Sequence, residues 1–369
     1  MSDPCLLDDL NRFGFNVYNT ANNHSCDYSF GGLLATIANL RKCGIAFCGT
    51  GENLFEASSP CYVDTKGGRV AVLGACSSFH DSDAAGNQSV SLPGRPGLNP
   101  LRYRKIITVN KSDFNRLKDI SEKYYVNADK LDSIRLGYSK PLPEDSMTFG
   151  GLNFRCSDED GVESFPLEKD MQRMEKRIKD AKLQADLAVV SIHAHEFAQN
   201  DTSLPAQFIE IFARKCIDAG ADAVIGHGPH ELRGIEIYKG KPIFYSLGNF
   251  VFETETVAVQ PADAYENKSM AHDTLVGEYM NERSAGGTRG YGTIDKIWFS
   301  VVAGFTAEDG RITEITLDPI SLGKGEGVSK MGVPYLSKDE KVLEYLAELS
   351  APYGTKIDIK DGRGRIVIE

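Results

Sequence analysis

Positive charge, tryptophan, histidine and long apolar runs are all scarce in this chain. Its 369 residues include one tryptophan, seven histidines, and 41 lysines and arginines against 52 aspartates and glutamates, a formal net charge of −11. A nucleic-acid partner is not expected, because phosphate binding requires a basic face. No apolar run reaches the roughly 20 residues that span a bilayer, so we expect no transmembrane segment. As written, the sequence predicts a cytoplasmic protein, and a membrane-associated or extracellular location would require an anchor ahead of residue 1.

The eight cysteines include no C-x-x-C pair. This spread favours small buried thiols in a reduced compartment over a disulfide framework. Cys26 lies two residues after His24 and could also be a thiolate ligand or a nucleophile, although packing is the simpler interpretation.

Five of the seven histidines fall in three short segments, and each segment follows a run typical of a buried strand. The runs are residues 16–20, 187–191 and 223–225. The histidines that follow them are His24, His193, His195, His227 and His230. Loops at the carboxyl ends of parallel strands meet at one edge of a sheet. Imidazole is the commonest ligand of borderline metals, so we expect a site for zinc, manganese or iron at this edge.

The spacing within these segments indicates roles. His227 and His230 are separated by glycine and proline, which favour a loop where both side chains turn toward one ion. His193 and His195 alternate, so both would point to the same side of a strand. We expect His193 to be a ligand and His195 to contact either substrate or solvent.

Residues 22–27 combine two amides, a histidine and an acid. An amide oxygen can coordinate a borderline ion, and His24 beside it could protonate a leaving group. Alone, Asn22 and Asn23 are typical turn residues, because asparagine tolerates the left-handed backbone. Together with the other two clusters they favour a place in the site.

The order of the expected elements favours an α/β fold. A helix over 33–41 lies between two strand-like runs and predicts a parallel βαβ unit. Helices over 167–185 and 205–219 each lead into a strand and then a histidine loop, so one pattern occurs twice.

Periodicity is lost over about 80–163, apart from an amphipathic piece near 114–125, and residues 253–293 are polar and glycine-rich. We interpret both segments as insertions, the first over one rim of the sheet. Residues 1–330 would form one core domain, and residues 331–369 a small tail of helix and strand. The chain opens with a helix over 6–13 and no strand before it, so we expect an upstream segment.

Five segments share their motifs with one known family. They are Ala-Asn-Asn-His at 21–24 followed by Asp27, Gly-Thr-Gly at 49–51, Val-Val-Ser-Ile-His at 189–193, Gly-His-Gly-Pro-His at 226–230, and Leu-Gly-Asn-Phe at 247–250. In these segments the chain resembles the poly-gamma-glutamate capsule-synthesis proteins, the CapA family, which is similar to the calcineurin-like metallophosphatases. The resemblance covers residues 6–75 and 186–252.

The resemblance implies a four-layer αββα sandwich with a metal site at the rim of the sheet. One or two divalent ions of manganese, zinc or iron would bind there. Four side chains would be metal ligands: Asn23, His193, His227 and His230. Two would carry the acid chemistry: His24 and Asp27. Three would contact the substrate: Asn22, His195 and Asn249.

Two departures from the family pattern lower the expected activity. The family begins with a strand that ends in Gly-Asp and supplies a metal ligand, and this sequence has no counterpart. The sandwich would therefore lack its first strand. His195 also stands where many relatives carry glycine. We expect at most one tightly bound metal and weak or no hydrolysis.

The leading hypothesis is a CapA-like, metal-dependent hydrolase-fold protein. It would act in the making, attachment or processing of an anionic polymer or peptide, with poly-gamma-glutamate as the expected polymer and a capsule-synthesis complex as the expected setting. One alternative is a non-catalytic accessory subunit of a polymer synthesis or export complex. Another is a metallophosphoesterase that acts on a small phosphate ester. Metal content would separate the accessory subunit from both enzymes.

Overall fold

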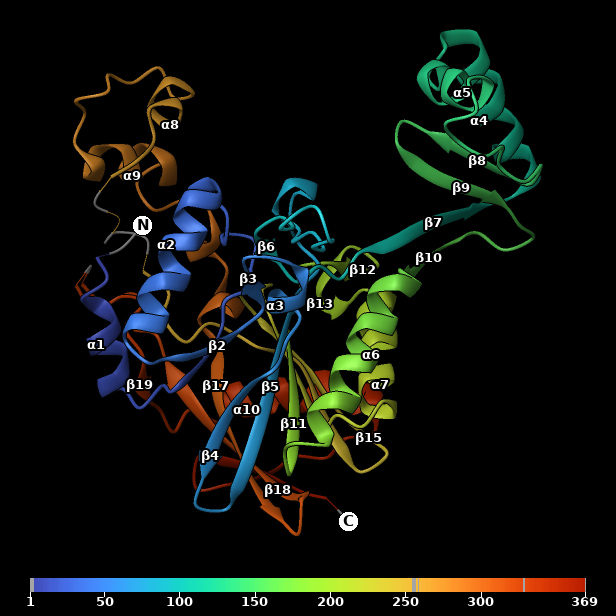
Figure 1. Cartoon of the computed structure of the whole chain (residues 1–369). Helices are drawn as coiled ribbons and strands as arrows, with labels where there is room; N and C mark the ends of the chain where they lie inside the picture. Colours follow the sequence, from blue (N-terminus) through green and yellow to red (C-terminus); the bar gives the residue numbers. More distant parts are fainter. Residues whose placement is uncertain (1–2, 254–256, 258, 328, 369) are drawn as a thin grey trace.

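A six-stranded mixed sheet forms the centre of the molecule (Figure 1). The computed structural model describes residues 3–253, 257, 259–327 and 329–368. The sheet order is β15-β16-β14-β11-β5-β4, in which the four inner strands are parallel and the two edge strands antiparallel. The strands are β4 (Cys61–Thr65), β5 (Gly68–Cys76), β11 (Leu187–His193), β14 (Ala223–His227), β15 (Leu232–Tyr238) and β16 (Lys241–Leu247). The strands expected near 187–191 and 223–225 are confirmed.

Two helices cover one face of this sheet. They are α6 (Glu168–Lys182) and α7 (Gln207–Asp218), and both were expected from helical periodicity. Phe208, Phe212 and Cys216 recur every fourth residue along α7 and are completely buried. They pack in one core cluster with Met174 of α6 and Val190 of β11. Because β11 is buried on both faces, its sequence is a continuous apolar run.

A second sheet packs on the opposite face. Its order is β17-β18-β21-β20, with β19 paired to β18. The elements are β17 (Ser300–Glu308), β18 (Arg311–Ser321), β19 (Tyr335–Leu336), α10 (Glu340–Ser350), β20 (Asp358–Lys360) and β21 (Arg363–Val367). Val189 and Phe244 of the first sheet share a core cluster with Leu317 of the second and Leu343 of α10. The expected mixed α/β class is confirmed, whereas the four-layer αββα sandwich and the domain division at residue 330 remain predictions.

The N-terminal region forms the expected βαβ unit. β1 (Val17–Asn19) pairs in parallel with β2 (Ala46–Cys48), and α2 (Ser29–Lys42) is the crossover between them. Among the described strands, this pair forms a sheet of its own and shares no strand ladder with either larger sheet. A short helix α1 (Leu6–Arg12) precedes it, and β3 (Thr50–Gly51), α3 (Leu54–Ala57) and β6 (Gly97–Leu98) follow.

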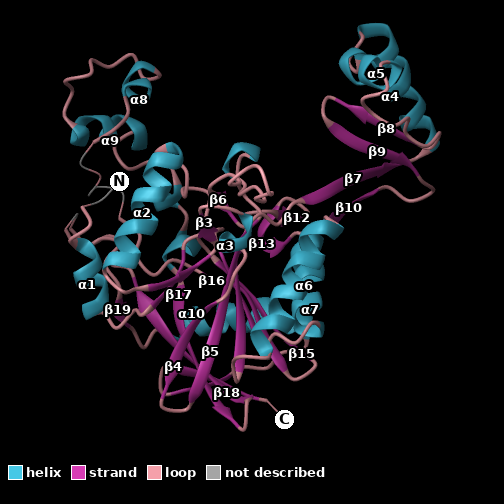
Figure 2. Ribbon diagram, in the orientation of Figure 1, coloured by secondary structure: helices cyan, strands magenta, loops and turns pink. Residues whose placement is uncertain are grey.

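Residues 103–166 form a small unit that we call the arm, and Figure 2 shows it extending outward from the body. Its sheet order is β10-β7-β9-β8. The elements are β7 (Tyr103–Val109), α4 (Lys111–Tyr124), α5 (Ala128–Arg135), β8 (Ser146–Phe149), β9 (Leu152–Cys156) and β10 (Gly161–Pro166). Helix α4 lies where the amphipathic piece near 114–125 was expected, whereas the strands of the arm were not expected. Its strands are short, and β7 pairs with β9 across two intervening helices, so no local pattern marks the pairing.

The second expected insertion, residues 253–293, also contains regular structure. α8 (Ala262–Glu266) and α9 (Val276–Ser284) pack through Tyr265, Tyr279 and Met280. Residues 254–256 and 258 of this insertion lie outside the described residues. Among the helices that the structure describes, none has the length and apolar surface needed to cross a bilayer.

The packing of α7 makes a direct prediction about stability. Phe212 is 0% exposed in the main core, so Phe212→Ala should lower the free energy of unfolding by about 3–5 kcal/mol. Phe13→Ala is the matched control, because Phe13 is 69% exposed and its loss should change stability by less than about 0.5 kcal/mol. Chemical denaturation followed by circular dichroism measures both. Equal effects of the two substitutions would contradict the core assignment.

Candidate functional site

Three histidines meet where two parallel strands end. His193 is the last residue of β11 and His227 the last of β14, and the strand register pairs them directly. Their Nδ1 atoms lie 3.1 Å apart, and Nε2 of His193 lies 3.0 Å from Nε2 of His195. The sequence prediction that these side chains share one rim agrees with this placement.

His230 joins the cluster from the loop after β14. Its backbone is left-handed (φ 63°), and Gly228 in the same loop has φ 125°. A Cβ at Gly228 would approach the Ala194 backbone to 3.0 Å, so glycine permits this close turn. The ring centroid of His230 lies 5.7 Å from that of His195.

Asn249 anchors His230. Oδ1 of Asn249 lies 2.8 Å from Nδ1 of His230, and its Nδ2 donates to the carbonyl oxygens of His230 and Ile297. Asn249 is 9% exposed. The sequence assigned it to substrate contact, and that role remains a prediction, but the observed contacts are those of a residue that holds a histidine in place.

A cavity of about 630 Å³ is lined by side chains of the segment 23–27 and by His195; from the segment these are Asn23, His24, Cys26 and Asp27. Oδ1 of Asn22 accepts a hydrogen bond from the backbone N–H of His24, an interaction typical of a turn. Nδ1 of His24 lies 2.9 Å from the Asp27 carboxylate, and Nε2 lies 3.3 Å from Nδ2 of Asn23. His24 and Asp27 remain largely exposed, so this pair is open to a molecule in the cavity.

Burial keeps the cluster uncharged. It lowers the pKa of His193 to about 2, with further lowering from His227, His195 and other neighbouring histidines. Burial likewise lowers the pKa values of His195 and His227 to about 4 each. The three rings are therefore neutral near pH 7, and a neutral imidazole has the free lone pair that a metal ligand needs.

The donor chemistry fits a borderline metal ion, and the arrangement offers donors in pairs. Two nitrogens bonded to one ion at about 2.0–2.1 Å lie roughly 3.3 Å apart in tetrahedral geometry, close to the separations seen here. His193, however, presents Nδ1 to His227 and Nε2 to His195, so one ion could use only one of these pairs. Within the described residues, no three histidine, cysteine, aspartate or glutamate side chains are placed to hold one ion.

Asn19 is a site residue that sequence reasoning missed. Its Nδ2 lies 3.2 Å from Nε2 of His227 and donates to Oγ of Ser191 at 3.0 Å. A Cβ at Gly49 or Gly74 would collide with Oδ1 of Asn19, so both glycines make room for this side chain. Oγ of Ser191 lies 3.0 Å from Nε2 of His227. Strand alternation could have revealed this residue, because it precedes His193 by two positions and so points to the same face of the strand.

A second missed group supports His195. Ser77 and Ser78 both donate to the Glu196 carboxylate, and Oγ of Ser78 accepts from the N–H of His195. Arg233 is completely buried and donates to the carbonyl oxygen of His195 at 3.2 Å. Nothing in the sequence pattern links these residues, because they come from three different strands or strand ends.

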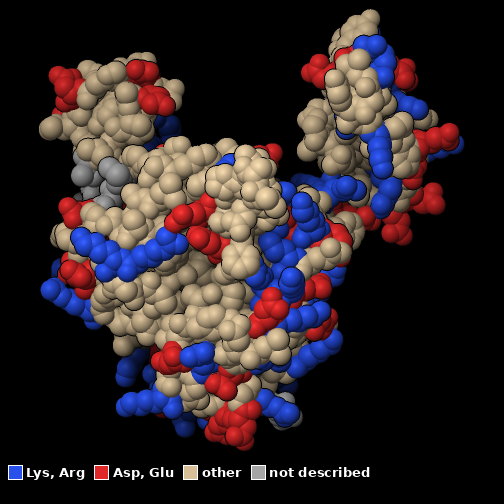
Figure 3. Space-filling model, in the orientation of Figure 1, with Lys and Arg blue, Asp and Glu red and all other residues tan. Residues whose placement is uncertain are grey.

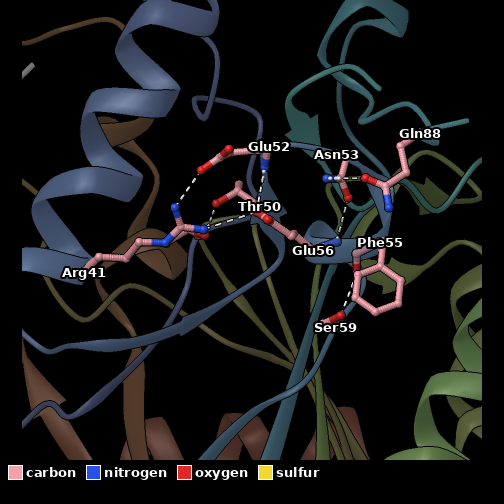
Figure 4. Close-up of polar contacts among 9 residues, drawn as sticks. Arg41, Thr50, Glu52, Asn53, Phe55, Glu56, Ser59 and Gln88 are labelled. Atoms are coloured by element: carbon pink, nitrogen blue, oxygen red, sulfur yellow. Dashed lines mark hydrogen bonds and ion pairs between the residues drawn. The ribbon is translucent and has the colours of Figure 1, made fainter. Parts of the chain in front are cut away.

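Residues 49–57 begin with the Gly-Thr-Gly motif that resembles the CapA family. Figure 4 shows the polar contacts around this segment. Arg41 of α2 pairs with Glu52 at 2.6 Å and with Glu56 at 3.2 Å. Oδ1 of Asn53 accepts from the N–H of Glu56 and caps α3. These contacts tie α3 to α2, so we assign this motif to the support of the fold.

The family described as "Bacterial capsule synthesis protein PGA_cap" matches residues 1–254. The chain belongs to this family. The resemblance inferred from the motifs is thereby confirmed.

Individual relatives extend the similarity over different lengths. The chain is 34% identical over 375 aligned positions to the "Uncharacterized protein y4sH" of Sinorhizobium fredii, covering 99% of this chain and 79% of the relative. It is 29% identical to the "Capsule biosynthesis protein CapA" of Bacillus anthracis over 65% of this chain, and 28% identical to the "PGA biosynthesis protein CapA" of Bacillus subtilis over 67%. The matched regions span 41% and 44% of these two CapA proteins.

The contacts of Asn19 predict a loss of stability when its amide is removed. Asn19→Ala removes the acceptor of the Ala21 N–H and the donor to Oγ of Ser191, and should lower the free energy of unfolding by about 1–3 kcal/mol. The control is Asn39→Ala, because the Asn39 amide bonds only to Ala35 in its own helix. Urea unfolding measures both variants. A loss no larger than that of the control would contradict the role given to Asn19.

Proposed function

We propose that this chain acts in capsule-polymer metabolism as a metal-dependent hydrolase-fold protein that processes poly-gamma-glutamate or a closely similar polymer. The observation that carries the proposal is a single cavity lined both by the open His24–Asp27 pair and by His195, a member of the neutral histidine cluster. Membership of the capsule-synthesis family supports the choice of polymer.

The metal would be held by imidazoles of the cluster. His193 and His227 form the more buried pair, and Asn19 and Ser191 contact the far nitrogen of His227. Such contacts fix the orientation and tautomer of a ligand ring. When bound, a divalent ion supplies Lewis acidity that polarises the carbonyl of the bond to be cleaved.

The His24–Asp27 pair would serve proton transfer. Asp27 contacts Nδ1 of His24, which leaves Nε2 facing Asn23 and the cavity. A histidine oriented by a carboxylate can deliver a proton to a leaving nitrogen or oxygen. His195 faces the same cavity and would contact the polymer chain.

A non-catalytic accessory role is the alternative that one observation favours. The cluster offers ligand pairs and no carboxylate in contact with an imidazole of His193, His195 or His227 among the described residues. Such a donor set would bind a metal more weakly than one with bridging acids, and the cavity could then act as a polymer-binding surface.

Metal content provides the first test. We expect the purified protein, dialysed against zinc or manganese, to retain at most one ion per chain, and His227→Ala should remove most of it. His272→Ala is the control, because His272 pairs with Glu266 on the surface. Elemental analysis measures the metal. Full retention by His227→Ala, or two ions per chain in the unmodified protein, would contradict the assignment.

Cleavage provides the second test. With metal present, we expect the protein to shorten poly-gamma-glutamate slowly and to leave a simple phosphate ester intact. His24→Gln should slow shortening by about 100-fold or more, because general acid catalysis typically contributes a factor of this size. Size-exclusion chromatography of the polymer and phosphate release measure the two reactions. Phosphate release without polymer shortening would favour the metallophosphoesterase, and polymer binding without cleavage would favour the accessory role.

A further inference from the structure

A second cavity lies where the arm joins the body, at the start of β7. Its volume is about 380 Å³, and its lining includes Tyr103, Arg104, Lys105, Ile107, Leu152 and Asn153. We call it the root pocket. Its walls are formed by β7, the turn between β8 and β9 with the first residues of β9, and the residue before α6.

The root pocket is positively charged in an otherwise acidic protein. Arg104 and Lys105 are exposed, and within the described residues neither forms an ion pair. Neighbouring arginines differ, because Arg102 pairs with Asp170 and Arg155 with Glu163. The lining of the pocket carries no aspartate or glutamate. Figure 3 shows lysine and arginine side chains gathered where the arm meets the body.

The apolar part of the lining is held rigidly. The ring of Tyr103 stacks on Phe208 of α7, with centroids 4.1 Å apart and planes 4° from parallel. Nδ2 of Asn153 donates to the carbonyl oxygen of Lys105, and the neighbouring Leu152 is 48% exposed. A pocket with cations on one side and aliphatic and aromatic surface on the other suits a chain that alternates carboxylates with methylene groups.

The backbone connects the root pocket to the histidine cluster. The N–H of Leu101 donates to the carbonyl of Cys76 at 2.7 Å, and the N–H of Ser77 donates to the carbonyl of His193 at 2.9 Å. β7 begins two residues after Leu101. The arm is therefore anchored at the same rim that carries the histidines, so one extended polymer could reach both places.

We propose that the root pocket is a second binding site for an acidic polymer, in which Arg104 and Lys105 bind the carboxylates of glutamyl units and Tyr103 and Leu152 contact their methylene groups. The identity of the polymer rests on the proposed function, whereas the pocket itself is independent of the histidines. In a chain of net charge −11, such a site would hold a polyanion that the rest of the surface repels.

The test measures binding of a fluorescently labelled oligo-gamma-glutamate by anisotropy at low ionic strength. The double variant Arg104→Glu, Lys105→Glu should bind at least about tenfold more weakly, because two attractions become repulsions. The matched control is Lys111→Glu, Lys118→Glu on α4, which makes the same charge change in the same arm outside the pocket. It should bind within about twofold of the unmodified protein.

A gain-of-binding variant separates the effect of charge from the effect of misfolding. Leu152→Lys adds a cation to the pocket and should tighten binding by a few-fold, an effect that a damaged arm cannot produce. Equal binding by the two double variants, or no gain with Leu152→Lys, would overturn the proposal. A sulfated oligosaccharide that binds more tightly than oligo-gamma-glutamate would also overturn it, because the proposal is that the pocket recognises carboxylates.

His227→Ala separates this proposal from the proposed function. It should abolish cleavage and retain pocket binding, because His227 contributes nothing to the root pocket. If the pocket variants bind normally while His227→Ala stops cleavage, the root pocket is refuted and the proposed function stands. If the pocket variants lose binding while no cleavage is found, the root pocket stands and the proposed function is refuted.

Discussion

The candidate site depends on the parallel pairing of β11 with β14. This register places His193 directly opposite His227, and the Nδ1 atoms of the two imidazoles lie 3.1 Å apart. A slip of one residue would turn either ring to the opposite face of the sheet. The pairing is itself held by burial on both faces, with α7 on one side and the second sheet on the other. The packing that holds β11 against β14 therefore also sets the geometry of the site.

Burial of uncharged imidazoles is the second constraint on the site. Close-packed histidines without a contacting carboxylate are stable only as neutral rings, because charged ones would repel each other in a poorly solvated place. Asn19, Ser191 and Asn249 supply the polar partners that these neutral rings need. The positive charge that an anionic polymer requires must then come from elsewhere, and Arg104 and Lys105 at the root of the arm are placed to provide it.

Much of the body could be predicted from the sequence, because its signals are local. Apolar runs mark β11 and β14, helical periodicity marks α6 and α7, and the histidines follow the strand ends. The convergence of His193, His195, His227 and His230 then follows from the rule that parallel strands end at one edge. The resemblance to the capsule-synthesis family rested on the same segments and is confirmed by the family match.

The remainder depends on contacts between distant segments. In the arm the sequence predicts only the amphipathic segment near 114–125, because the strands pair across two helices, as Ile106 does with Asn153. Asn19 was missed because its place depends on glycines from two other segments, Gly49 and Gly74. Asn249 was assigned to substrate, since no sequence pattern reveals that its amide holds His230. Each of these features is a tertiary contact with no periodic signature.

Anomalous diffraction from crystals soaked in zinc tests the central claim most directly, because it locates the ion without relying on activity. The account predicts one peak at the rim of the six-stranded sheet, about 2.0–2.1 Å from imidazole nitrogens of His193 and of one neighbouring histidine. Zinc bound only at surface residues such as His272, with the histidine cluster metal-free and still hydrogen-bonded to itself, would contradict it.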